Sequence, residues 1–153
     1  MILYLDTSAL VKLYVEEPGS RAVVAAVEEA AGVATVRVTY AEARATFARL
    51  QRERRLTAAE RRRCVEYLDE DWEGMTVVDV SEAIVRRAGV LAERRRLRGY
   101  DAIQLGAALE LHLAGRDVTF ACADGRLARA ARRERLRVAG TRAETGRSTA
   151  RFH

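Results

Sequence analysis

The chain opens with MILYLDTSALVKLY (residues 1–14), and this stretch decides the fold. Its apolar run, Ile2 to Leu5, predicts a buried strand, and the stripe of Leu10, Leu13 and Tyr14 predicts a helix directly after it. Asp6 stands at the end of the strand. A carboxylate at this point either caps the following helix or holds a ligand.

The same order, a short apolar run followed by a helical pattern, recurs along the chain. Further strands are predicted at residues 33–38, 75–80, 118–122 and 136–140, and further helices at 20–31, 39–55, 57–72, 81–96, 100–115 and 124–134. The strands are continuous apolar runs, which is typical of parallel strands buried on both faces. We therefore expect an α/β fold, a three-layer sandwich in which helices flank a mostly parallel sheet.

No linker, repeat or low-complexity block divides the 153 residues, so one domain is expected over residues 1–140. Residues 141–153 are polar and arginine-rich and predict a flexible tail. No apolar stretch approaches the roughly 20 residues of a membrane span, and no basic segment precedes the first apolar run. With two cysteines and no export signal, a reducing cytoplasmic location is expected.

The net charge is +5, and Lys12 is the single lysine among 27 basic residues. Arginine suits two-pronged contacts to phosphate, and a basic balance fits a nucleic-acid partner. A GC-rich genome would produce the same arginine bias through codon usage. Composition alone leaves both explanations open.

Four acidic residues lie where predicted helices begin: Asp6, Glu42, Asp101 and Asp124. Three of them follow predicted strands closely, and the carboxyl ends of parallel strands form the edge at which such sheets bind ligands. Gathered carboxylates repel one another and raise their own pKa values unless a cation neutralises them. Mg²⁺ or Mn²⁺ accepts such hard oxygen ligands without histidine or cysteine. The joint pattern favours a metal site.

Each acid also has a simpler explanation. Thr39 and Glu42 fit the T-x-x-E capping box, in which the glutamate bonds back to the first amide of a helix. Asp6, Asp101 and Asp124 could each cap a helix or complement its dipole.

Other chemistries find little support. His112 falls inside a predicted helix and His153 is the last residue, so neither a serine–histidine–acid triad nor a zinc site is indicated. Cys64 and Cys122 are too far apart for a C-x-x-C motif, and no phosphate-binding glycine loop is present. A receiver domain would also place an aspartate after a strand, but it would need a late lysine that this chain lacks.

The segments YLDTSALVKLY, TYAEARATFARL, LRGYDAIQLGAAL and TFACADGRLARAA together resemble the PIN-domain ribonucleases, in particular the VapC-like toxins of toxin–antitoxin pairs. The resemblance covers nearly the whole chain and implies a PIN-like parallel-sheet sandwich. It implies that Asp6, Glu42, Asp101 and Asp124 form the catalytic, metal-binding site, with Ser8 supporting it through its hydroxyl. Where relatives often carry threonine or serine, this chain has Cys122, a poor partner for Mg²⁺.

The expected activity is metal-dependent hydrolysis of RNA by an endoribonuclease that inhibits growth. Water as nucleophile leaves 5′-phosphate ends, and Mg²⁺ or Mn²⁺ is the expected cofactor. Arg126, Arg129 and Arg133 fall on one face of a predicted helix and are candidate RNA contacts, as are the arginines of residues 94–98, although a solvated basic face explains them equally well.

The resemblance further implies a tRNA or rRNA substrate, a cognate antitoxin and a homodimer. The apolar residues Leu10, Leu13 and Tyr14 and the valines of RAVVAAV could form a groove for the antitoxin, or could face the chain's own core. Two alternatives stay open: a nuclease of DNA or of RNA processing outside any toxin pair, and an RNA-binding module whose acids are structural caps.

Overall fold

The structure, a computed structural model, describes residues 1–140, so the tail expected at residues 141–153 lies outside the described residues. The strands are β1 (Ile2–Leu5), β2 (Gly32–Val36), β3 (Thr76–Val78), β4 (Val118–Ala121) and β5 (Arg137–Val138). The helices are α1 (Thr7–Val11), α2 (Ser20–Glu29), α3 (Val38–Arg52), α4 (Ala58–Trp72), α5 (Glu82–Arg95), α6 (Gly99–Leu113) and α7 (Gly125–Arg133). The predicted elements are present in the predicted order.

The described strands form one sheet in the order β3-β2-β1-β4-β5, and all neighbours pair in parallel. β1 is central, with β2 on one side and β4 on the other. The expectation of a mostly parallel sheet is confirmed. Because the strands are parallel, the loops after β1, β2 and β4 leave the sheet at the same edge.

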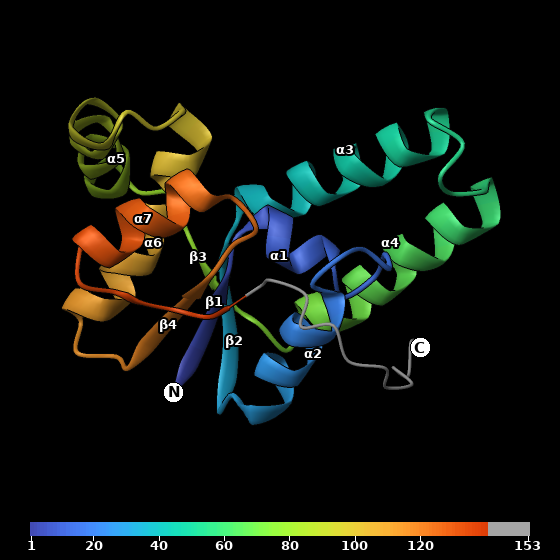
Figure 1. Cartoon of the computed structure of the whole chain (residues 1–153), viewed down its shortest axis with the longest axis horizontal. Helices are drawn as coiled ribbons and strands as arrows, with labels where there is room; N and C mark the ends of the chain where they lie inside the picture. Colours follow the sequence, from blue (N-terminus) through green and yellow to red (C-terminus); the bar gives the residue numbers. More distant parts are fainter. Residues whose placement is uncertain (141–153) are drawn as a thin grey trace.

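Side chains of β1 alternate between two cores, one on each face of the sheet. Tyr4 belongs to the core under α5, α6 and α7, while Leu3 and Leu5 belong to the core under α1, α2, α3 and α4. Figure 1 shows the two helical layers on either side of the sheet, with α3 and α4 reaching away from it. The three-layer α/β sandwich is therefore confirmed, and the central strand β1 is buried on both faces.

Several element boundaries differ from the prediction. β2 ends at Val36, because Arg37 takes helical dihedral angles, while its amide still donates to the carbonyl of Val78 in β3 at 2.9 Å. The helix predicted at residues 20–31 is shorter: α2 stops at Glu29, and Gly32 pairs with Ile2 as the first residue of β2. α1 is also shorter than predicted and ends at Val11.

Two predicted helix boundaries are confirmed. The helix predicted at residues 57–72 begins with a capping box of Thr57 and Glu60. The Glu60 carboxylate accepts from the Thr57 amide at 2.7 Å, and the Thr57 hydroxyl accepts from the Glu60 amide at 3.1 Å. Gly115, with φ of 81°, follows α6, where an L side chain would be strained.

The apolar residues considered for an antitoxin groove mostly serve this chain's own core. Leu10 and Val23 are fully buried, and Leu13 and Tyr14 pack half-buried against the same cluster. The groove prediction is therefore wrong for Leu10 and Val23, because both side chains belong to the buried core on one face of the sheet. None of the helices in residues 1–140 has the length and apolar character of a membrane span.

Candidate active site

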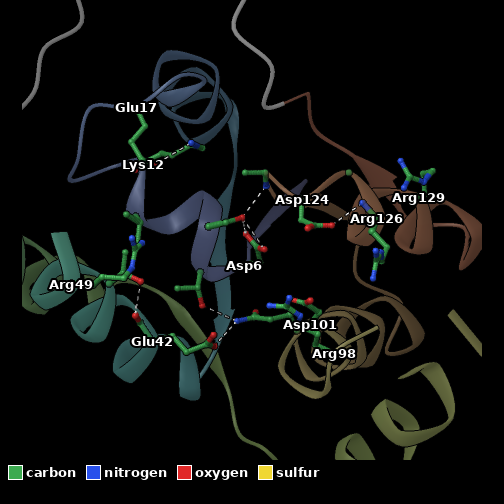
Figure 2. A pocket seen from close by; sticks show the side chains of 17 residues that line it. Asp6, Lys12, Glu17, Glu42, Arg49, Arg98, Asp101, Asp124, Arg126 and Arg129 are labelled. Atoms are coloured by element: carbon green, nitrogen blue, oxygen red, sulfur yellow. Dashed lines mark hydrogen bonds and ion pairs between the residues drawn. The ribbon is translucent and has the colours of Figure 1, made fainter. Parts of the chain in front are cut away.

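A cavity of about 720 Å³ opens where β1 and β4 give way to α1 and α7. All four predicted acids line it: Asp6, Glu42, Asp101 and Asp124. They come from four different parts of the chain, and Figure 2 shows them around one pocket. The structure thus brings together the residues that the sequence grouped.

Asp6 is the most buried of these acids, with 5% of its surface exposed. One carboxylate oxygen accepts from the Ala9 amide at 2.8 Å, so Asp6 caps α1. The Ser8 hydroxyl donates to the same carboxylate at 2.7 Å and itself accepts from the Ala123 amide at 2.8 Å. Ser8 therefore connects Asp6 to the loop after β4.

Burial raises the pKa of the Asp6 carboxyl from 3.8 to about 7. Hydrogen bonds from Ser8 and Ala9 lower this pKa, and the negative charges of Asp101 and Glu42 raise it further. The cap is thus too weak to offset burial and repulsion. A carboxylate placed in this way gains most from a nearby cation.

Glu42 lies on α3, and the capping box predicted for it is absent. α3 begins earlier, at Val38, and its N-cap Arg37 makes no side-chain cap bond. Glu42 instead accepts from the Gln104 side-chain amide at 3.3 Å. Burial raises its pKa, hydrogen bonds from Thr7 and Gln104 lower it, and the charge of Asp101 raises it.

Asp101 does not cap its helix either, because the N-cap of α6 is Arg98. Burial raises the pKa of Asp101 and the charge of Asp124 adds to the rise, while Arg98 and Arg126 lower it. Asp124 is a helix cap: one of its carboxylate oxygens accepts from the amides of Arg126 and Leu127 at 2.7 and 2.8 Å. Capping alone therefore explains two of the acids and not the other two.

The donor set fits a divalent cation by its chemistry. Among residues 1–140, carboxylates and hydroxyls line the cavity together with basic groups, and no histidine or cysteine does. Within residues 1–140, no three acidic, histidine or cysteine side chains are grouped so that they could hold one ion as they stand. Mg²⁺ commonly takes one or two protein carboxylates and keeps several waters, so a pair of these acids suffices.

The predicted arginine contacts divide into two groups. Arg126 and Arg129 line the cavity, and so does Arg98 from the run at residues 94–98. Arg133 does not, because it ends α7, about 10 Å along the helix axis from Arg126. Two other arginines of residues 94–98, Arg94 and Arg95, pair with Glu134 at 2.9 and 2.7 Å and face α7.

Cys122, the departure noted in the sequence, is buried behind the loop. Its thiol donates to the backbone carbonyl of Asp124 at 3.4 Å, and the residue does not line the cavity. Burial raises its pKa well above the ordinary value, and the charges of Asp6 and Asp124 add to this. The thiol thus packs as a neutral group and offers nothing to a cation.

Sequence reasoning missed Gln104, which organises the floor of the site. Its carbonyl accepts from the Tyr4 hydroxyl at 3.0 Å, and its amide donates to Thr39 at 2.9 Å, to Thr7 at 3.2 Å and to Glu42. The signal was a polar residue inside the apolar run of LRGYDAIQLGAAL, one helical turn after Asp101. Lys12 and Arg49 also line the cavity and were missed.

Comparison with known proteins agrees with this architecture. The family model described as PIN domain matches residues 3–133. Two proteins of Mycobacterium tuberculosis, Ribonuclease VapC45 of strain CDC 1551 / Oshkosh and Ribonuclease VapC49 of strain ATCC 25618 / H37Rv, are each 32% identical over 108 residues, covering 71% of this chain and 75% of theirs.

Solved structures show the same fold. FitAcB from Neisseria gonorrhoeae has a TM-score of 0.64 at 20% identity, with 92% of this chain and 98% of that chain covered. VapBC2 from Rickettsia felis, bound to a promoter DNA fragment, has a TM-score of 0.63 at 16% identity, with coverage of 90% and 97%. On the match of its sequence to the family and to these relatives, the chain belongs to the PIN-domain family, among its VapC-like members.

Proposed function

We propose that this protein is a divalent-metal-dependent endoribonuclease that acts as a growth-inhibiting toxin and is neutralised by a cognate antitoxin. One observation carries the proposal: four carboxylates from separate elements line one cavity, and burial and mutual repulsion raise the pKa values of Asp6, Glu42 and Asp101. Curated relatives at 32% identity are named as ribonucleases, which supports RNA as the substrate.

Asp6, Glu42, Asp101 and Asp124 would hold one or two Mg²⁺ or Mn²⁺ ions. Such ions supply Lewis-acid stabilisation of a scissile phosphate and a water of lowered pKa as nucleophile. Ser8 holds the Asp6 carboxylate in place through bonds of 2.7 and 3.0 Å, and Gln104 holds Glu42. Arg98, Arg126 and Arg129 attract the phosphate backbone beside this negative centre.

The biological assignment rests on the relatives. Structures with the same fold include toxin–antitoxin complexes, which supports an antitoxin partner for this chain. The homodimer, the tRNA or rRNA substrate and the cytoplasmic location stay predictions. We also keep the domain assignment as proposed: residues 1–140 as the nuclease domain and 141–153 as a tail.

Cleavage of pooled cellular tRNA and rRNA tests the activity. Wild-type protein should cut with Mg²⁺ or Mn²⁺, stop when chelator is added and leave 5′-phosphate ends, because water is the nucleophile. Asp6→Asn, Asp101→Asn and Asp124→Asn should abolish cleavage with the fold retained by circular dichroism. Asp79→Asn is the matched control, since Asp79 is exposed and outside the cavity. Wild-type rates in Asp6→Asn would refute the site assignment.

Expression in a bacterial host separates the toxin from the alternatives. Growth arrest that depends on Asp6 supports a toxin, whereas RNA cleavage without growth arrest supports a processing nuclease. RNA binding that survives without any cleavage supports the non-catalytic module. Recovery of the native complex with a small co-purifying protein supports the antitoxin.

A further inference from the structure

The cavity continues past the carboxylates between α1 and α3. The residues that line this far end are Val11, Lys12, Glu17, Thr46 and Arg49. Glu42 and Arg49 are seven residues apart on α3 and so share a face, about 10 Å apart along the axis. The far end therefore extends the cavity with two basic side chains, Lys12 and Arg49, and one acidic side chain, Glu17, and contains none of the four site acids.

Sheet topology puts this end of the cavity opposite the candidate RNA contacts Arg126 and Arg129. β2 and β4 flank β1, so α3, which follows β2, and α7, which follows β4, begin on opposite sides of Asp6. Figure 2 shows Lys12 and Arg49 on one side of Asp6 and Arg126 and Arg129 on the other. Positive charge thus flanks the carboxylates on both sides.

Lys12 is held rigidly at this end. It is 6% exposed, and its ammonium donates to Glu17 at 3.1 Å and to the carbonyl of Pro18 at 3.0 Å. An ammonium has three N–H groups, so one is left without a partner in the described part of the chain. Glu17 also pairs with Arg55 at 3.4 Å, so two cations, Lys12 and Arg55, balance its single negative charge.

Arg49 is exposed and its pairing is weak. Its guanidinium bonds to Glu53 at 3.0 Å across one helical turn, with about half of each side chain in solvent. Exposed pairs of this kind contribute at most about 1 kcal/mol, so a phosphate easily displaces Glu53. Arginine also binds phosphate through two parallel hydrogen bonds.

We infer that Lys12 and Arg49 form a second phosphate-binding subsite for single-stranded RNA, across the carboxylates from Arg98, Arg126 and Arg129. The inference rests on the proposed function and deepens it. The strand crosses the acidic centre with its phosphates held on both sides. The enzyme therefore requires nucleotides on both sides of the scissile bond, as an endonuclease does.

Arg49→Gln tests the subsite, with Arg52→Gln as matched control on the exposed end of the same helix. For an RNA with a central cleavage site, we expect Arg49→Gln to raise KM about tenfold with kcat nearly unchanged, because one charge-assisted contact is lost. The dependence of log affinity on log salt should fall by roughly 0.7, the value for one phosphate on a single strand. Arg52→Gln should change neither.

Neutral methylphosphonate linkages locate the contact. In wild-type protein, one neutral linkage on each side of the scissile phosphate should weaken binding. Arg49→Gln should remove the sensitivity on one side, and Arg126→Gln the sensitivity on the other. Loss of the same side in both variants would overturn the proposed path. Lys12 is a poor first position to substitute. Its removal takes one of two cations from the partly buried Glu17 carboxylate, so a change in RNA binding could not be separated from a change in stability.

The outcomes separate this inference from the proposed function. If wild-type protein cleaves RNA and Arg49→Gln behaves like Arg52→Gln, the subsite is wrong and the nuclease stands. If wild-type protein binds RNA in chelator without ever cleaving it, the proposed function fails, and the binding and salt dependence of the two variants still decide the subsite. If wild-type protein binds no RNA, both are overturned.

Discussion

Asp6→Asn should make the metal-free protein more stable above neutral pH. The substitution removes one negative charge from a site where the carboxyl is 5% exposed and lies near Asp101 and Glu42. Asparagine keeps the size of the side chain and an oxygen that accepts from the Ala9 amide and the Ser8 hydroxyl, and it is a good N-cap. Charge is therefore the main difference between the two proteins.

The magnitude follows from the pKa of Asp6. It is about 7 in the folded protein against 3.8 for the ordinary group. The folded state then binds more protons than the unfolded state between these values, so the stability of the wild type falls as pH rises through this window. The full loss is about 4 kcal/mol above pH 7, at 1.36 kcal/mol per pKa unit. Allowing for weaker hydrogen bonds to asparagine, we expect a gain of about 2–4 kcal/mol.

Urea unfolding in chelator measures this gain. The two proteins should differ little near about pH 4 and increasingly up to about pH 7, since neutral Asp6 resembles asparagine. Added Mg²⁺ should stabilise the wild type more than the variant, because binding to the folded state adds stability by mass action. Asp79→Asn controls for the loss of an exposed charge. A variant that is less stable than wild type at every pH would show that Asp6 is only a cap.

Three further substitutions test other parts of the structure. Asp101 caps no helix, so Asp101→Ala should leave the metal-free protein as stable as wild type or up to about 1 kcal/mol more stable in thermal melting. A loss of about 0.5–2 kcal/mol would show that Asp101 is a cap. Gln104→Leu should lower the free energy of unfolding in urea by about 2–3 kcal/mol, because the buried Tyr4 hydroxyl loses its acceptor. An unchanged urea midpoint would refute a stabilising role for the hydrogen bonds of Gln104. Thr57→Ala should lower the free energy of unfolding by about 1 kcal/mol, because α4 loses its N-cap, and RNA cleavage should be unchanged. A loss of cleavage would contradict the position of Thr57 outside the cavity.

The meeting of the acids could be predicted because it depends on topology. Apolar runs without alternation indicate parallel strands, and parallel strands put Asp6 and Asp124 at one edge whatever the detailed packing. Glu42 was also predicted correctly at this edge of the sheet, but the capping box considered as an alternative role for it is absent. Thr39 and Glu42 match a capping box, yet α3 begins at Val38, so Thr39 lies inside the helix and its hydroxyl accepts from Gln104 at 2.9 Å.

What sequence could not supply are the contacts that depend on tertiary packing. Arg37 is the N-cap of α3, and its amide bonds to the carbonyl of Val78 in the neighbouring strand β3, a contact between residues far apart in sequence. Arg49 shares a face of α3 with Glu42, but only the packing of α3 against α1 shows that this face lines the cavity. Arg126, Arg129 and Arg133 share a periodicity, and only the distance along α7 separates Arg133 from the cavity.

The two explanations of Asp6 turn out to be compatible. The Ala9 amide and the Ser8 hydroxyl both donate to one carboxylate oxygen, at 2.8 and 2.7 Å, and this fixes the plane of the group. Ser8 has a single hydroxyl proton, which is shared between this oxygen and the second carboxylate oxygen at 3.0 Å, while the hydroxyl oxygen accepts from the Ala123 amide. Capping thus orients the carboxylate without neutralising it. The pKa of about 7 reflects the burial and repulsion that the two hydrogen bonds do not offset. A cap that leaves its own charge unsatisfied in a cavity lined by three other acids is what the proposed cation site requires of Asp6, and the helix that Asp6 begins would hold this ligand in position.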